Sequence, residues 1–203
     1  MSSGIRAHET LDVSGLPLVA FGSRSLPWWG AVLLILIEGT GFLLLLATYL
    51  YLRGNSEVWP PEGIRSPDMI YAAVGTLALT LSALPNHLAN AAALRGEVQR
   101  MRLFLGIATV LAVVTAACRA LEFRELPFSW YSHAYGSVFW TILGMHSIHL
   151  VTGILENAFV VFVLLKGPVE QKHQADVRAG GLYWYFLILS WLPLFGVLYG
   201  ERC

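Results

Sequence analysis

The chain of 203 residues is 56% hydrophobic and only 13% charged, with a mean hydropathy of +0.62. A soluble domain of this length rarely has such a composition, so the chain is expected to be an integral membrane protein. Its 13 basic and 13 acidic residues cancel, and it contains no dense run of Lys and Arg. This balance excludes nucleic acid as a partner.

Five segments are apolar and long enough to cross the hydrocarbon of a membrane, which takes about 20 residues of helix. In chain order they are residues 28–52, 69–94, 101–121, 135–165 and 182–199. Residues 1–27 form a polar to mixed tail without the pattern of a removable signal peptide, so the first helix is expected to direct insertion. The sequence predicts one all-α domain over residues 28–203, an integral membrane bundle of about five transmembrane helices.

Basic residues in the flanks of these segments predict the orientation of the bundle. The side that includes the amino-terminal tail holds eight Lys and Arg residues, whereas the opposite side holds five. Because basic flanks are retained in the cytoplasm, we expect the amino terminus to be cytoplasmic and the carboxyl terminus to lie outside.

One carboxyl is predicted to lie near the middle of the first segment. Glu38 follows Trp28 by ten residues, which is about 15 Å along a helix. Nothing on its own helix neutralises it, so it needs a partner, a water-lined cavity or a proton. Two interpretations stay open: a protonated Glu38 that joins two helices, and a proton-handling residue. Gly39 and Gly41 leave room there for a close helix or a lipid tail.

The fourth segment carries His146, His149 and Glu156 within an otherwise apolar run. Residues three and seven apart project from nearly the same side of a helix, so these three side chains form one polar stripe beside Gly153. The stripe is expected to face protein or a lined cavity. We expect its histidines to hydrogen-bond carboxyls such as Glu156 or Glu122, since polar pairs specify helix packing in membranes.

Arg119 and Glu122 are three residues apart and predict a local ion pair at the outer end of the third segment. Two ligand interpretations of the histidines are weaker alternatives. One is a metal held by the pair on the fourth segment, and the other is a haem held between His87 and His149 at similar depths. The sequence shows no nucleophile elbow, phosphate loop, metalloprotease helix or acid-rich metal cluster. We therefore expect no catalytic residue, metal or cofactor in the chain itself.

Several of these elements form a combination that is known from one family. They are Glu38-Gly-Thr-Gly-Phe42, Arg119-Ala-Leu-Glu122-Phe123, Gly136-Ser137, Gly144-Met-His146-Ser-Ile-His149-Leu-Val-Thr-Gly153, the loop residue His173, and Tyr183-Trp184-Tyr185-Phe186. Together they resemble subunit III of the haem-copper terminal oxidases, in its short form with five transmembrane helices. The resemblance extends over nearly the whole chain from Trp28 onward, and the combination is far more specific than any single motif.

This resemblance implies an accessory subunit of an oxygen-reducing, proton-pumping complex in the bacterial cytoplasmic (inner) membrane. Subunit III of that family packs against subunit I in a complex with subunit II, binds phospholipid in a cleft, and supports proton uptake and turnover stability. It holds no redox metal, and haem and copper lie in the catalytic subunit. Glu38 resembles the family's carbodiimide-reactive glutamate. The candidate residues for contact with lipid or a partner are Arg53, His173, Trp184 and Tyr185.

Three positions depart from the family pattern. Tyr185 and Ile188 replace a His and an Asp of the terminal helix, and Arg119 replaces a Gln. Other functions therefore stay open beside the first. They are a subunit III-like component of a nitric oxide reductase, a stand-alone di-haem electron carrier, and a small proton-coupled carrier. The electron donor of the complex, cytochrome c or quinol, is a property of other subunits.

Overall fold

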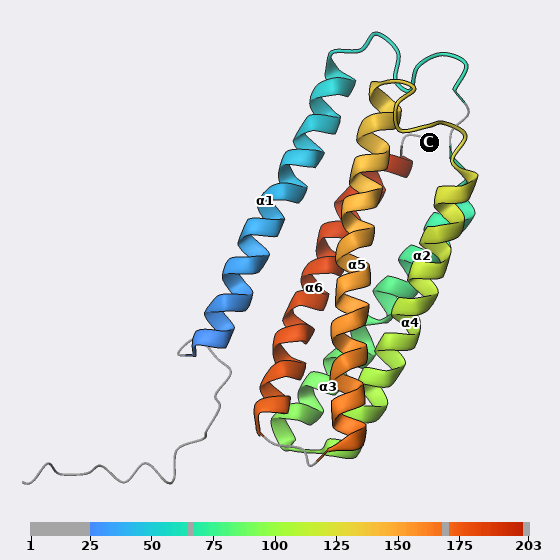
Figure 1. Ribbon diagram of the computed structural model, residues 1–203. Coiled ribbons are helices and arrows are strands. Elements are labelled where there is room, and N and C mark those ends of the chain that lie inside the picture. The colour runs from blue at the N-terminus through green and yellow to red at the C-terminus, as the bar shows by residue number, and fades with distance from the viewer. Residues whose placement is uncertain (1–24, 65–66, 168–170, 201–203) are drawn as a thin grey trace, which may run out of the picture.

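The computed structural model describes residues 25–64, 67–167 and 171–200, and every regular element in this part of the chain is a helix. The helices are α1 (Leu26–Gly54), α2 (Met69–Leu81), α3 (Ala83–Arg95), α4 (Val98–Glu125), α5 (Ala134–Lys166) and α6 (Gln171–Tyr199). Since α2 and α3 together make one span, five helices are long and apolar enough to cross a membrane. The predicted all-α bundle with five spans is confirmed (Figure 1).

The second span is interrupted at Ser82. Pro85 has no N–H group, and its ring crowds the carbonyl of Leu81, so a regular helix cannot pass through this turn. The backbone restarts at the break, where the Ser82 N–H donates to Ala78 at 3.0 Å and the Asn86 N–H donates to Ser82 at 3.1 Å. The break therefore bends the span while most of its backbone groups stay paired.

The last helix begins earlier than the sequence predicts. It starts at Gln171 rather than at residue 182, because residues 171–181 are too polar to register as part of an apolar span. The other helix ends differ from the predicted ones by no more than four residues. Pro193 lies inside α6, as the sequence indicates. The hydropathy pattern thus predicted the position of every span, but it underestimated the length of the last helix, whose first half is amphiphilic.

The helices α2 to α6 pack into a bundle, and α1 lies along one side of it (Figure 1). Among the described helices, α1 packs only against α5 and α6. The core is widest between α5 and α6, where Trp184, Trp191, Phe139 and Leu143 are fully buried. Most large apolar side chains of α1 are instead exposed, which suits a surface that faces lipid or another subunit.

An aromatic cluster fastens the C-terminal end of α1 to the bundle. It consists of Tyr49 in α1, Trp59 in the α1–α2 connection, and Tyr135 and Phe128 near the start of α5. The ring centroids of Trp59 lie 5.4 Å from Tyr49 and 5.2 Å from Tyr135, both edge to face. Such pairs stabilise a contact beyond the area they bury. No comparable cluster joins the N-terminal end of α1 to the bundle within the described residues.

Candidate functional site

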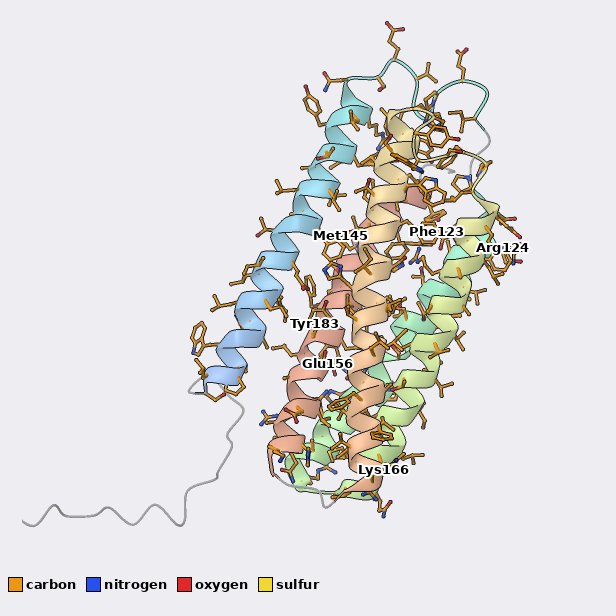
Figure 2. All side chains as sticks on the ribbon, viewed as in Figure 1. Phe123, Arg124, Met145, Glu156, Lys166 and Tyr183 are labelled. Atoms are coloured by element: carbon orange, nitrogen blue, oxygen red, sulfur yellow. The ribbon has the colours of Figure 1, made fainter. Side chains whose placement is uncertain are left out.

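A cavity of about 450 Å³ separates the N-terminal half of α1 from α5 and α6. We call it the cleft. Its walls are Pro27, Gly30, Ala31, Leu34 and Glu38 of α1, Thr152 and Glu156 of α5, and Ala179 and Tyr183 of α6. Figure 2 shows Glu156 and Tyr183 on the side of the bundle that faces α1. The cleft is therefore mostly apolar, with two carboxyls and two hydroxyls on its walls.

Glu38 lies at the inner end of the cleft and is largely buried, with 20% of its side chain exposed. Its Oε2 atom is 3.6 Å from Nε2 of His149, which is too long for a hydrogen bond. This oxygen has no hydrogen-bond partner among the described residues. The carboxyl also interacts electrostatically with the hydroxyl of Tyr183, and both groups line the cleft. Glu38 is thus a largely buried carboxyl that faces His149 of α5 and Tyr183 of α6.

The orientation of His149 is fixed by its own helix. Its Nδ1 atom lies 2.6 Å from the carbonyl oxygen of Met145, so it must carry a proton and donate to that carbonyl. The other ring nitrogen, Nε2, then faces Glu38 across the contact between α5 and α1. Phe42 packs on the imidazole at 5.1 Å between ring centroids and shields it from lipid. The sequence had predicted carboxyls such as Glu156 or Glu122 as partners, and this prediction is wrong for His149.

His146 points toward α6 instead of α1. Its Nε2 atom lies 3.2 Å from the carbonyl oxygen of Leu187, and its ring packs on Trp191 with centroids 4.6 Å apart. The side chain is fully buried, and its Nδ1 atom has no hydrogen-bond partner among the described residues. The partner of His146 is thus a backbone carbonyl, and the carboxyl predicted for it is absent. The role left to this residue is the packing of α5 against α6.

Glu156 does not join the histidines. It lies on the wall of the cleft, close enough to Tyr183 and to Asp176 of α6 for electrostatic interaction. It lies seven residues, about 10 Å, further along α5 than His149, so the two side chains point to nearly the same side of the helix without contact. The predicted stripe therefore divides: His149 faces Glu38, His146 faces α6, and Glu156 faces the cleft.

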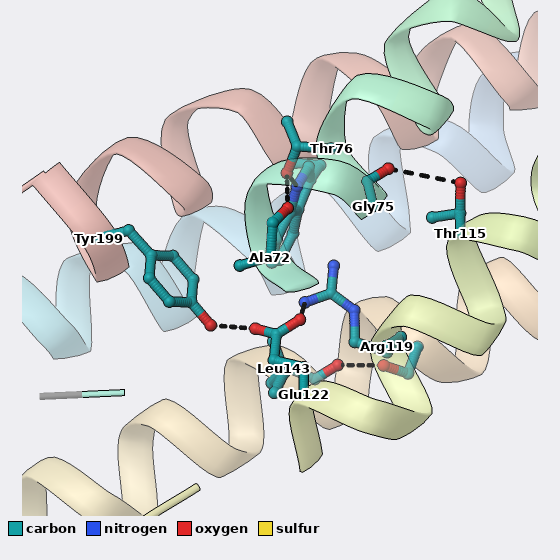
Figure 3. A network of polar contacts seen from close by, with 10 residues as sticks. Ala72, Gly75, Thr76, Thr115, Arg119, Glu122, Leu143 and Tyr199 are labelled. Carbon is teal, nitrogen blue, oxygen red and sulfur yellow. Dashed lines mark hydrogen bonds and ion pairs between the residues drawn. The ribbon is translucent and has the colours of Figure 1, made fainter. Parts of the chain in front are cut away.

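The ion pair between Arg119 and Glu122 forms as predicted, near the outer end of α4, but it is buried in the bundle rather than placed at the membrane interface. Their N–O distance is 2.8 Å, and only 6% and 2% of the two side chains are exposed. The second carboxyl oxygen accepts a hydrogen bond from Tyr199 of α6 (Figure 3). The Arg119 guanidinium also lies 3.8 Å from the ring centroid of Trp191. A chain of contacts thus runs from Glu122 to Arg119, from Arg119 to the ring of Trp191, and from Trp191 to the ring of His146.

Two members of this network were not found by the sequence reasoning. Tyr199 and Trp191 lie on α6, and their partners lie 77 and 115 residues away in the chain. Trp191 donates its Nε1–H to the hydroxyl of Thr76 in α2 at 2.8 Å. The signal that could have indicated them is the set of polar-tipped aromatics in an otherwise apolar final helix, because buried Trp and Tyr need partners.

The candidates for lipid or partner contact have different environments. Trp184 is 1% exposed and donates to the hydroxyl of Ser82 at 2.8 Å, so its prediction as a contact residue is wrong. Tyr185 is half-buried, and its hydroxyl lies 3.2 Å from Nδ1 of His87. Arg53 is exposed at the end of α1, and His173 lies in the first turn of α6. For these last three residues, lipid or partner contact stays a prediction.

The histidines do not converge on a ligand. His87 contacts Tyr185, whereas His149 contacts Met145 and faces Glu38. In the described part of the chain, no three side chains of His, Cys, Asp or Glu are grouped so that they could hold a metal ion. The geometry therefore gives no support to the alternatives of a haem between His87 and His149 or of a metal site on α5.

Five membrane-length helices around an interior held together by aromatic and polar contacts define a multi-pass helical membrane protein. A comparison with family models matches residues 26–200 to Cytochrome c oxidase subunit III. The chain belongs to this family, and the resemblance seen in its motifs is confirmed.

Curated relatives support the same family. Cytochrome c oxidase subunit 3 of Thermostichus vulcanus is 28% identical over 194 residues, which cover 95% of this chain and 90% of the relative. The protein of that name from Synechocystis is 26% identical over 88% of this chain and 77% of the relative. The one from Prototheca wickerhamii is 32% identical over 70% of this chain and 55% of the relative.

Proposed function

We propose that the chain is an accessory subunit III of a haem-copper terminal oxidase in aerobic respiration. It lies in the bacterial cytoplasmic (inner) membrane with its amino terminus in the cytoplasm, packs on subunit I, and belongs to a complex with subunit II. The membership of the family over residues 26–200 is the observation that carries this proposal. The relatives named above are themselves subunits of cytochrome c oxidase by name.

In this proposal the redox chemistry belongs to the partner. Haem and copper are held by subunit I, where oxygen is reduced to water, in keeping with the membership of this chain in the subunit III family. The exposed apolar faces of α1, α2 and α4 supply the surface for packing against other subunits and lipid. The residues of this chain act by packing and by handling protons.

The cleft is the proposed binding site for phospholipid. Its apolar walls on α1 and α6 suit an acyl chain. Glu38 at its inner end is the proposed protonatable group that supports proton uptake by the complex. Its burial, its unpaired Oε2 atom and its contact with His149 favour this role over simple helix packing.

The test is purification from native membranes through an affinity tag on this chain. We expect subunits I and II to co-elute, the optical spectrum to show haem, and the preparation to consume oxygen. Co-elution of a nitric oxide reductase would contradict the oxidase assignment and favour that partner. A haem spectrum from the chain expressed alone would favour a di-haem carrier, and transport by the chain in liposomes would favour a proton-coupled carrier.

The same preparation tests Glu38. Glu38→Gln keeps the shape and polarity of the side chain but removes the titratable proton, so we expect normal assembly with altered proton pumping and a shorter active lifetime during turnover. Glu125→Gln is the matched control, because Glu125 is exposed at the end of α4. Unchanged pumping and lifetime in Glu38→Gln would refute the proton role and leave the assembly assignment intact.

A further inference from the structure

We propose that Tyr183 and Glu156 form a proton path along the wall of the cleft, through which Glu38 exchanges its proton with water at the surface near the start of α6. This inference rests on the proposed role of Glu38 and adds the route by which its proton moves.

The first step of the path is a direct contact. The Tyr183 hydroxyl interacts with the Glu38 carboxyl and the Thr152 hydroxyl, and all three side chains line the same cleft. A phenol can donate one proton while accepting another, so it can pass a proton on without itself becoming charged. Tyr183 is only partly buried and lines the cleft, so water in the cavity can reach its oxygen.

The second step runs through the cavity. Glu156 lines the same cleft from α5, one helical turn beyond Thr152, and is exposed there. A volume of about 450 Å³ holds several water molecules, because each takes about 30 Å³ in the liquid. The polar wall supplies the two to four partners that such waters need. Asp176 of α6, which is exposed and interacts electrostatically with Glu156, extends the acidic wall toward the end of the bundle.

The charges around the cleft favour protons over other ligands. Its described lining contains two carboxyls and no Lys or Arg, so the phosphate of a lipid would be repelled from the polar wall while an acyl chain could occupy the apolar side. The groups that face Glu38 are His149 from α5 and Tyr183 from α6, with Glu156 further along α5. An acidic, hydroxyl-lined wall is the chemistry expected of a proton route in a membrane.

The transfer balances without any other reactant. Tyr183 gives its hydroxyl proton to the Glu38 carboxylate and receives one, through water, from the protonated carboxyl of Glu156. Glu156 becomes a carboxylate and is reprotonated by water at the surface. The net result is one proton on Glu38 and one fewer in the aqueous phase. The reverse sequence discharges Glu38.

Infrared spectroscopy of the purified protein tests this path. The C=O stretch of protonated Glu38 is the band that disappears in Glu38→Gln, and its shift after transfer to heavy water gives the rate of proton exchange. We expect Tyr183→Phe and Glu156→Gln each to slow this exchange on the order of 10²-fold, the contribution typical of a positioned proton-transfer group. Glu156→Asp should restore most of the rate, which a merely structural role would not predict.

Matched controls lie outside the cleft. Tyr51→Phe removes an exposed hydroxyl from α1, and Glu125→Gln removes an exposed carboxyl from α4, and neither should change the rate. Unchanged exchange in Tyr183→Phe or in Glu156→Gln overturns the path, as does the absence of any Glu38 band. Because the full chain can be measured with or without its partners, such a failure is distinguishable from a failure of assembly.

Discussion

Arg119 places a full positive charge within the bundle at a position where the family pattern has a Gln. Its pairing with Glu122 at 2.8 Å supplies the opposite charge, and Tyr199 satisfies the second carboxyl oxygen. The guanidinium face lies over Trp191, which adds a cation–π contact. Ile188, at one of the positions where α6 departs from the family pattern, is buried as an apolar side chain.

Arg119→Met should be strongly destabilising, because it leaves Glu122 charged and buried without its partner. Breaking a buried pair in this way costs about 3–5 kcal/mol. The double variant Arg119→Met, Glu122→Leu removes both charges and should recover most of that loss. Thermal unfolding of the purified protein in detergent measures both effects.

Arg100→Met is the control for this prediction, since Arg100 pairs with Glu97 at the exposed start of α4. Loss of such a surface pair should cost less than about 1 kcal/mol. If Arg119→Met unfolds at the same temperature as Arg100→Met, the buried pair does not stabilise the bundle. If the double variant is no better than the single one, the damage arises from lost packing instead of an unpaired charge.

The spacing of Arg119 and Glu122 was enough to predict that they pair, because residues three apart on a helix are always neighbours. It could not indicate that the pair is buried, since that depends on which helices cover α4. Glu38 illustrates the same limit. Its position in the middle of an apolar helix predicted an unusual carboxyl, but its neighbours His149 and Tyr183 come from helices more than 100 residues away.

At the scale of the elements, the break between α2 and α3 provides a polar contact with α6. The bend exposes the hydroxyl of Ser82 to α6, where it accepts the Nε1–H of Trp184 at 2.8 Å. Both side chains are buried, and Ser82 is 0% exposed. The same hydroxyl donates to the carbonyl oxygen of Leu79 at 2.5 Å, as the hydroxyls of Thr76 and Thr80 donate to the turns that precede them. The hydrogen bond from Trp184 therefore helps to fix the position of α6 against the second span.

Ser82→Ala should destabilise the protein by about 1–3 kcal/mol, because the indole N–H of Trp184 is then buried without an acceptor. The effect is measured by thermal unfolding. Ser56→Ala is the matched control, since the Ser56 hydroxyl donates only to the carbonyl of Leu52 at the exposed end of α1. Equal unfolding temperatures for the two variants would mean that this hydrogen bond does not hold α6.

The break itself was not predicted, although Pro85 was visible in the sequence. A proline in an apolar span is tolerated when neighbouring side chains satisfy the freed backbone, so its presence alone does not say whether the helix bends or ends. The first half of α6 was missed for the opposite reason. Residues 171–181 form a helix because they pack against the bundle, where Gly180 and Gly181 leave room for Glu156 and Asn90, and hydropathy does not report such contacts.

At the scale of the whole molecule, α1 is attached to the bundle unequally along its length. Its C-terminal end is fixed by the aromatic cluster of Tyr49, Trp59, Tyr135 and Phe128, and its middle by Phe42 and Glu38. The N-terminal end borders the cleft. The cleft depends on this arrangement, because it exists only where α1 departs from α5 and α6.

We therefore expect the N-terminal half of α1 to move more than its C-terminal end, because fewer buried contacts restrain it. Spin labels at Ala31→Cys and Ala179→Cys span the cleft, and labels at Asn55→Cys and Trp130→Cys span the opposite end, in a chain with Cys118→Ala and Cys203→Ser. Pulsed electron spin resonance should give a broader distance distribution for the first pair in detergent. Added phospholipid should narrow that distribution and leave the second pair unchanged, since only the cleft offers an acyl chain a place to bind. Equal widths for the two pairs, or no response to lipid, would show that α1 is held rigidly along its whole length and that the cleft does not take up lipid.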